Sequence, residues 1–301
     1  MILVILPFIC VLLAVGFFTL FERKVLAAIM IRKGPNKVGY MGLMQPFSDA
    51  GKLFCKEFIF PNYANLGPFY VAPGLMLGIS LSLWIMYPMN FVDMMFVFSM
   101  LQFLATASVS VFGVMMAGWA SNSKYALLGS VRSIAQSISY EIPFSLILFT
   151  ITSVSFSFMF QEVMSWQESC VVFFSMYLMG FSLWLVSILA ENHRAPFDFV
   201  EGESELVSGF NVEYSGGGFA MIFMSEYSSM MFSSFVTSVM FFGGHELFVS
   251  VLTLFFIFFF VWVRGTFPRM RYDKLMYLGW TIFTIVPLVF LMGVVVLGCC
   301  S

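Results

Sequence analysis

The sequence predicts an all-α membrane protein with eight transmembrane helices and an interfacial amphipathic helix in its first loop. Of 301 residues, 60% are hydrophobic and only 10% are charged, whereas a soluble domain carries about a quarter charged residues. Uncharged runs long enough to cross a bilayer recur along the chain, and the basic residues fall only between them. These observations together predict one polytopic membrane domain over residues 1–301.

The spans follow from the requirement for about 20 mainly apolar residues per membrane helix. Seven uncharged stretches meet or approach this length, and an eighth contains one acid, Glu226. The long second stretch begins with several prolines, so we expect a loop in its first part. The eight predicted spans are Met1–Phe21, Phe58–Val92, Met94–Ser123, Ile142–Gln161, Ser169–Ala190, about 219–242, Leu247–Val263 and Leu275–Ser301.

The basic residues predict the orientation. Loops one, three, five and seven contain seven, two, one and four lysines or arginines, and the even loops and both termini contain none. By the positive-inside rule, the odd loops face the compartment of synthesis and both termini face away from it. These loops are expected at residues 22–67, 120–137, 191–216 and 264–275.

The first of these loops contains a segment with helical periodicity. Four apolar residues fall on one face of a helix over 46–58, and three charged residues fall on another. Such a helix is expected to lie in the membrane interface. The apolar residues are Phe47, Ala50, Phe54 and Phe58, and the charged ones are Asp49, Lys52 and Lys56.

Two acids lie in or beside predicted spans. Glu226 lies about seven residues inside its helix, where a carboxylate is costly and faces a protein interior or a water-filled path. Glu141 follows a polar stripe of Arg132, Gln136 and Tyr140, and its half-turn offset prevents pairing with Arg132. For both acids we weigh a proton-path role against a structural partner on a neighbouring helix.

The fifth loop concentrates six carboxylates around one arginine, Arg194. Closely spaced acids in a poorly hydrated place cannot all ionise freely, so some are expected to hold protons near neutral pH. A solvated acidic loop is the alternative, but interleaved Phe, Val and Leu residues favour a buried or docked segment. The six acids are Glu191, Asp198, Glu201, Glu203, Glu205 and Glu213.

Other function classes find little support. The net charge of −2 argues against a nucleic-acid partner. The five cysteines lack metal-ligand spacing, and no nucleotide-binding motif is present, so we expect no flavin, nicotinamide, iron–sulfur centre or metal on this chain. Three arginines and a lysine in the seventh loop favour either anionic lipid headgroups or a partner subunit.

Four stretches resemble one known family. They are RKGPNKVGYMGLMQPFSDAGKLFCKE (32–57), GWASNSKYALLGSVRSIAQSISYE (118–141), APFDFVEGESELVSGFNVEY (195–214) and PRMRYDKLM (268–276). They are similar to chain 1 of NADH–ubiquinone oxidoreductase, the membrane subunit of mitochondrial respiratory complex I. The resemblance covers essentially the whole chain, and EGESELVSGFN is long and specific.

The resemblance implies a core membrane subunit that encloses part of a ubiquinone chamber and couples quinone reduction to proton translocation. It implies ubiquinone as substrate, other membrane and hydrophilic-arm subunits as partners, and the mitochondrial inner membrane with both termini on the intermembrane-space side. The quinone-binding residues it implies are Arg23, Asp49 and Phe223. The proton-coupling residues are Glu141, Glu191, Glu201, Glu203, Glu205 and Glu226, supported by Tyr140, Arg132 and Arg194.

The chain departs from the family pattern at two places. The family usually has AETNR where residues 190–194 read AENHR, which introduces His193, and it usually has Trp-Lys where this chain has Trp280 and Thr281. Two other functions remain open on residues alone. One is a stand-alone ion-coupled transporter, which predicts repeated halves that we do not find. The other is a structural membrane anchor for a soluble enzyme.

Overall fold

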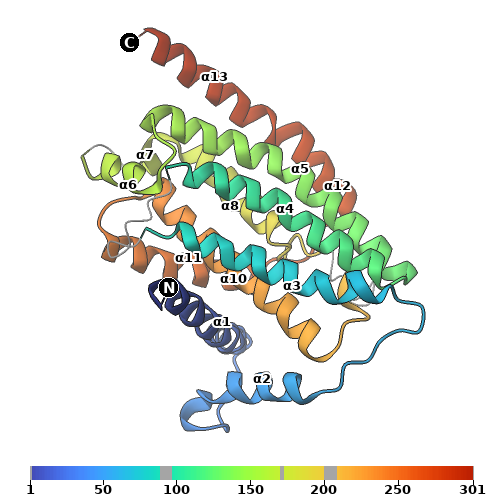
Figure 1. The fold of residues 1–301 in the computed structure, drawn as a ribbon. Helices are drawn as coiled ribbons and strands as arrows, with labels where there is room; N and C mark the ends of the chain where they lie inside the picture. Colours follow the sequence, from blue (N-terminus) through green and yellow to red (C-terminus); the bar gives the residue numbers. More distant parts are fainter. Residues whose placement is uncertain (1, 89–96, 170–172, 200–208, 301) are drawn as a thin grey trace.

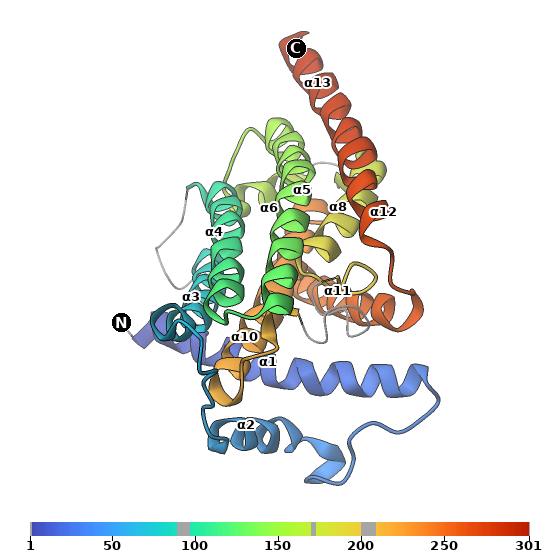
Figure 2. The ribbon, with the colours of Figure 1, turned by 90° about the vertical axis from the view of Figure 1, so that its right-hand side faces the viewer.

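The computed structural model describes residues 2–88, 97–169, 173–199 and 209–300, and these residues form helices and connecting turns without a strand. Most long helices lie side by side in one bundle, and α2 lies apart from it beside α1 (Figures 1 and 2). The α-helices are α1 (Ile2–Ile29), α2 (Gln45–Cys55), α3 (Leu66–Leu83), α4 (Ser99–Ala120), α5 (Lys124–Ser155), α6 (Phe160–Ser169), α7 (Phe173–Met176), α8 (Leu178–Glu191), α10 (Gly216–Phe241), α11 (Glu246–Thr266), α12 (Tyr272–Leu278) and α13 (Ile285–Cys300). Short 3₁₀ turns occur at η1 (Tyr40–Gly42), η2 (Trp84–Met86) and η3 (Gly209–Asn211), and a π-helical turn η4 (Gly279–Phe283) joins α12 to α13.

Six helical segments in the described part of the chain are long and apolar enough to cross a membrane, against eight predicted spans. The other two predicted spans correspond to α8, which is short at 14 residues, and to α10, which is long but rich in serine. The six segments are Leu6–Ile29, Leu66–Met86, Ser99–Ala120, Lys124–Ser155, Glu246–Thr266 and Tyr272–Val296. The chain is therefore an all-helical, multi-pass membrane protein.

Several helices extend past the predicted span ends. The first helix continues through Glu22, Arg23 and Lys24 to Ile29, and α5 begins at Lys124, so most of the expected loop 120–137 is helical. Charged residues mark where a helix leaves the apolar layer, but they do not end its backbone hydrogen bonding. Hydropathy therefore located the apolar spans, and the helices that contain them continue into the flanking charged segments.

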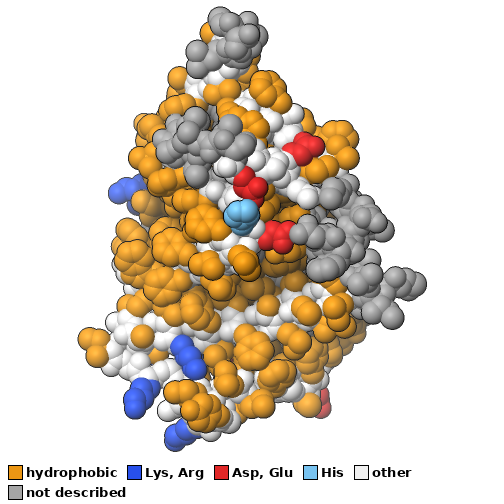
Figure 3. All heavy atoms as spheres, turned by 90° about the vertical axis from the view of Figure 1, so that its left-hand side faces the viewer, with side chains coloured by type: hydrophobic (Ala, Val, Ile, Leu, Met, Phe, Trp, Pro, Cys, Tyr) orange, Lys and Arg blue, Asp and Glu red, His pale blue; other side chains and the backbone are white. Residues whose placement is uncertain are grey.

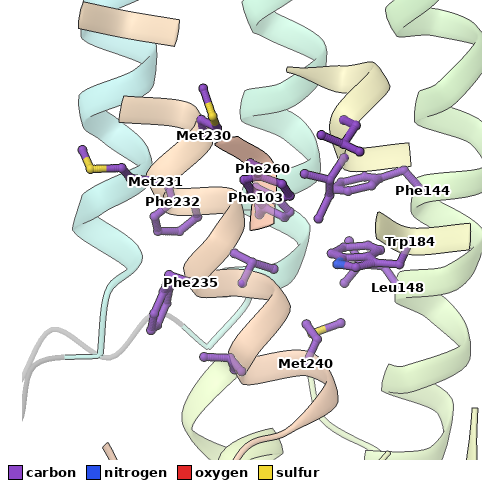
Figure 4. Close-up of a cluster of buried hydrophobic side chains, with 14 of the residues drawn as sticks. Phe103, Phe144, Leu148, Trp184, Met230, Met231, Phe232, Phe235, Met240 and Phe260 are labelled. Carbon is purple, nitrogen blue, oxygen red and sulfur yellow. The ribbon is translucent and has the colours of Figure 1, made fainter. Parts of the chain in front are cut away.

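The core of the bundle is packed from aromatic and methionine side chains (Figure 4). The Trp184 ring of α8 stacks on Phe144 of α5 at a centroid distance of 4.4 Å. Phe232 of α10 lies between Trp84 and Phe103, at 5.7 and 5.6 Å. Away from this core the surface is largely apolar, with few charged side chains on the face shown in Figure 3. The core therefore holds α5, α8 and α10 together around the loop that follows α8.

The predicted interfacial segment forms α2, in which every described side chain is at least partly exposed. One end of α2 is held by Phe17 and Phe47, whose rings meet at 6.0 Å. At the other end, Gly216 has φ of 57°, and a Cβ atom on it would lie 3.1 Å from the Lys56 carbonyl oxygen, so this close approach of the chain after α2 to the start of α10 favours glycine. This contact gives a packing role to a glycine run that otherwise reads as a flexible entry to the helix.

Candidate functional site

The main candidate site is a cavity between α3, α4, α10 and the end of α8. Space not filled by atoms amounts to about 880 Å³, part of it open to the surroundings. Its lining combines apolar side chains with hydroxyls and two acids, Glu191 and Glu226. The polar lining residues are Ser80, Thr106, Ser110, Glu191, Asn192, His193, Ser225, Glu226, Ser229 and Ser233. The structure therefore places two of the predicted proton-coupling acids on one cavity.

Glu191 is the last residue of α8 and the first of predicted loop five. Its Oε2 atom is buried and has no hydrogen-bond partner among the described residues. Burial, and to a smaller extent the carboxylate of Glu141 on α5, raise the pKa of Glu191 to about 8. The site therefore holds a carboxyl group that exchanges a proton near neutral pH.

The end of α8 is fixed by two amide side chains. The Nε2 of Gln136, fully buried on α5, donates to the carbonyl oxygens of Ala190 and Phe197 at 2.9 Å each. The Nδ2 of Asn192 donates to the Ser233 hydroxyl of α10 at 3.0 Å. These bonds position Glu191 at the cavity because they tie the residues around it to α5 and α10.

A buried charged cluster that the sequence did not predict lies between α1, α10 and α11. The Tyr227 hydroxyl donates a 2.6 Å hydrogen bond to Oε2 of Glu22, and the Arg264 guanidinium pairs with Oε1 of the same carboxylate. The guanidinium of Arg194 lies over the Tyr227 ring, 4.4 Å from its centroid. Glu22 is only 5% exposed. In the sequence, Glu22 stands out only as an acid directly after an apolar run. Its partners are distant in the sequence and could not be predicted from it.

Two of the expected quinone-binding residues pair with each other between α1 and α2, and the third lies on α10. A guanidinium nitrogen of Arg23 donates to Asp49 Oδ2 at 2.5 Å, and Gln45 supports the other oxygen of Asp49 at 3.0 Å. Phe223 lies on α10 with its ring 4.3 Å from Phe219. The structure therefore joins Arg23 to Asp49 directly and places Phe223 on a helix that packs against both α1 and α2.

Some of the remaining predicted site residues lie in the described part of the chain, and three lie outside it. Tyr140 is fully buried and its hydroxyl donates to the Leu275 carbonyl at 3.1 Å, which joins α5 to α12. Arg132 lies over the Tyr272 ring at 5.9 Å, and Glu141 is close enough to Glu191 to influence it. Glu201, Glu203 and Glu205 lie outside the described residues. Positions are thus established for Tyr140, Arg132, Arg194, Glu141, Glu191 and Glu226.

The part of loop five before residue 200 packs on loop seven. An Arg269 nitrogen donates to Oδ2 of Asp198 at 3.2 Å, and the Met270 amide donates to the Pro196 carbonyl at 3.1 Å. Phe197 and Phe199 are buried at 6% and 8% exposure. The described part of the loop is therefore docked, as its interleaved apolar residues predicted. No group of three His, Cys, Asp or Glu residues able to hold a metal occurs in the described ranges.

Comparisons with known proteins give one consistent result. A family model described as NADH dehydrogenase matches residues 2–295. The NADH-ubiquinone oxidoreductase chain 1 of Mytilus edulis is 59% identical over 97% of this chain and 96% of its own length. Proteins with the same name from Heterololigo bleekeri and Aedes aegypti are 52% and 51% identical, covering 90% and 91% of this chain and 88% of their own lengths.

Proposed function

The chain belongs to the NADH dehydrogenase family and is a core membrane subunit of NADH:ubiquinone oxidoreductase, and we propose that it links quinone reduction to proton movement through the cavity of Glu191 and Glu226. In this proposal the charge change at the reduced quinone alters the proton affinity of acids at loop five. Those acids then exchange protons with Glu226 across the hydroxyl-lined cavity. The observation that carries the proposal is that two predicted proton-coupling acids line one cavity.

The quinone side of the proposal rests on the arrangement of α1, α2 and α10. The quinone tail enters beside α2, whose exposed face and glycine-dependent contact with α10 suit a removable cover over a passage. The Arg23–Asp49 pair and Phe223 line this passage. The Glu22 cluster supplies positive charge near the path between the passage and the cavity in this proposal, from the buried Arg194 and from Arg264, whose side chain is 37% exposed.

The proton side of the proposal uses the serine hydroxyls of the cavity. Ser225 and Ser229 on α10 donate to carbonyl oxygens of their own helix at 2.6 and 2.8 Å. A hydroxyl whose hydrogen is bound in this way keeps its oxygen free to accept from water. The cavity wall therefore suits a chain of ordered waters between Glu191 and Glu226. In the proposal, Glu141 on α5 lies close enough to Glu191 to take part in this chain, and Glu201, Glu203 and Glu205, which lie outside the described residues, are given proton-coupling roles by the family resemblance alone.

The membrane placement belongs to the same proposal. We assign α8 and α10 as the two further spans, which gives eight, with α2 in the interface of the mitochondrial inner membrane. Loops 22–67, 120–137, 191–216 and 264–275 face the matrix and contact hydrophilic-arm subunits or anionic lipids, and both termini face the intermembrane space. The electron carriers are held by other subunits, and this chain contributes to the binding of ubiquinone as substrate.

The test is the variant Glu226→Gln in the assembled complex, introduced at the matching position of a homologous bacterial enzyme. Gln keeps the shape of the side chain but cannot carry a proton. We expect proton translocation per NADH oxidised to fall, while Glu162→Gln, at an exposed acid of α6, leaves it unchanged. Unchanged translocation in Glu226→Gln would contradict the proposed coupling role.

A further inference from the structure

A second, smaller cavity meets the main one beside Glu191. It lies between α4 and α5, with about 230 Å³ of space not filled by atoms. Glu191 and His193, with Ser110 and Val114, line both cavities, so they lie where the two adjoin. The lining of the second cavity is Ser110, Val111, Val114, Ser133, Ile134, Ser137, Glu191 and His193.

The second cavity, like the first, is lined by serine hydroxyls whose hydrogens are donated to backbone carbonyl oxygens. Ser133 and Ser137 on α5 donate to carbonyl oxygens of their own helix, at 2.7 Å for Ser133 and at 3.1 and 3.0 Å for Ser137. Their oxygens therefore remain available as acceptors for water. A row of hydroxyls thus continues from the meeting point of the cavities to the space between α4 and α5.

The imidazole of His193 is built into this meeting point. Its backbone has φ of 50°, in the left-handed region that is uncommon for residues other than glycine, although histidine is among the side chains found there more often. Its Nδ1 atom is buried and finds no hydrogen-bond partner among the residues that the structure describes. Burial, and then the charge of Arg194, lower the pKa of His193 to about 4. The ring is therefore neutral near pH 7, with one nitrogen that accepts a proton and one that donates.

The geometry points to His193 as a proton-relay residue that connects Glu191 to a second branch between α4 and α5, an inference that rests on the proposed proton role of Glu191. In one transfer, the bare nitrogen accepts a proton from the water chain on one side while the other nitrogen releases its proton to the other side. The ring is neutral again, but its hydrogen is now on the other nitrogen. A rotation of the imidazole that exchanges the two nitrogens restores the starting state. The charged groups around it are Glu191, Arg194, Glu226 across the main cavity, and Glu141 on α5.

The test compares His193→Ala with His245→Ala, which removes the exposed second histidine, in the assembled complex in sealed vesicles. We expect His193→Ala to lower proton translocation per NADH by about tenfold, less than the roughly 10²- to 10⁴-fold effect typical of a positioned acid or base, because water enters the vacated space. Added imidazole restores translocation in His193→Ala and does not raise it in His245→Ala. A purely structural role would not respond to imidazole.

Two results would overturn the relay. One is translocation in His193→Ala equal to that in His245→Ala. The other is a loss that imidazole does not restore. The variant Glu191→Gln separates this inference from the proposed function. If Glu191→Gln loses translocation and His193→Ala does not, only the relay is wrong. If Glu191→Gln retains full translocation, the proton role of Glu191 itself is wrong.

Discussion

The hydroxyl of Tyr227 on α10 donates a 2.6 Å hydrogen bond to the carboxylate of Glu22 on α1, across 205 positions of sequence. Arg264 on α11 pairs with the other oxygen of the same carboxylate. One buried acid therefore joins three helices that border the proposed quinone passage. Because buried ionic groups are costly unless paired and hydrogen-bonded, this cluster constrains how α1, α10 and α11 meet.

Replacing Glu22 with Gln is expected to destabilise this junction. Gln retains a carbonyl acceptor for Tyr227 but leaves the Arg264 guanidinium without its counter-charge. We expect a loss of about 1–3 kcal/mol, the range for hydrogen bonds to charged groups. Thermal inactivation of the purified complex measures the loss. Glu57→Gln, at an exposed acid near the end of α2, serves as the control. Equal stability of the two variants would show that the cluster contributes nothing.

Replacing Gln136 with Leu is expected to loosen the loop after α8. The change removes the side-chain donor from the carbonyls of Ala190 and Phe197, which keep their backbone hydrogen bonds from His193 and Phe199, and we expect a loss of about 0.5–1.5 kcal/mol per bond. Hydrogen exchange over residues 191–199 should become faster. The matched control is Gln167→Leu, because Gln167 makes the same kind of amide bridge to Val239 and Met240 at the far end of α10. If both variants speed exchange in this loop equally, the anchoring role of Gln136 is refuted.

The Arg23–Asp49 pair is expected to act on quinone binding more than on stability. Both side chains are substantially exposed, at 51% and 35%, and such pairs contribute only about 0–1 kcal/mol. Asp49→Asn should therefore raise the KM for a short-chain quinone with little change in thermal stability. Asp273→Asn breaks the similar exposed pair with Arg271 and provides the control. An unchanged KM in Asp49→Asn would remove this pair from the quinone passage.

The order of loop five should depend on pH in two opposite ways. The pKa of Glu191 rises from 4.5 to about 8 on folding, so the stability it contributes is complete below pH 4.5 and is lost as pH rises toward 8. The pKa of His193 falls from 6.5 to about 4, so its contribution is lost as pH falls below 6.5. Exchange protection factors for residues 191–199 measure both effects. Glu191→Gln should abolish only the loss of protection that occurs as pH rises toward 8. His193→Asn should abolish only the loss of protection that occurs as pH falls below 6.5. If the dependence of protection on pH is unchanged in both variants, these assignments are contradicted.

The sequence predicted where most helices lie because transfer of apolar residues into lipid depends on composition and length. It predicted a loop marked by Pro61, Pro68 and Pro73 before the second span, but the structure begins α3 at Leu66, so only Pro61 lies in that loop. Helix ends were less predictable, since α1 continues through Glu22 and Arg23, which find partners on α11 and α2. Partners from distant segments allow charged residues to remain inside a helix.

The candidate site was predictable to a similar extent. Glu191 and Glu226 stood out as acids in an apolar chain, and the structure places both on one cavity. Glu22, Gln136 and Asn192 were not predicted as site residues, because their roles depend on contacts 205, 54 and 41 residues away. His193 was visible only as a departure from a family pattern. Its position between two cavities became evident from the packing of α4, α5 and α10 around it.

The most direct test of the account is a double-mutant cycle on proton translocation per NADH, with Glu191→Gln, Glu226→Gln and both changes together in the assembled complex. If the two acids lie on one path, blocking either one interrupts it, and non-additive effects are the signature of such coupling. We predict that the double variant translocates at least as many protons per NADH as the single variant that translocates fewer. Two results would contradict the claim that this cavity carries the protons. One is a double variant whose loss equals the product of the losses in the two single variants. The other is translocation in the single variants equal to that of the parent.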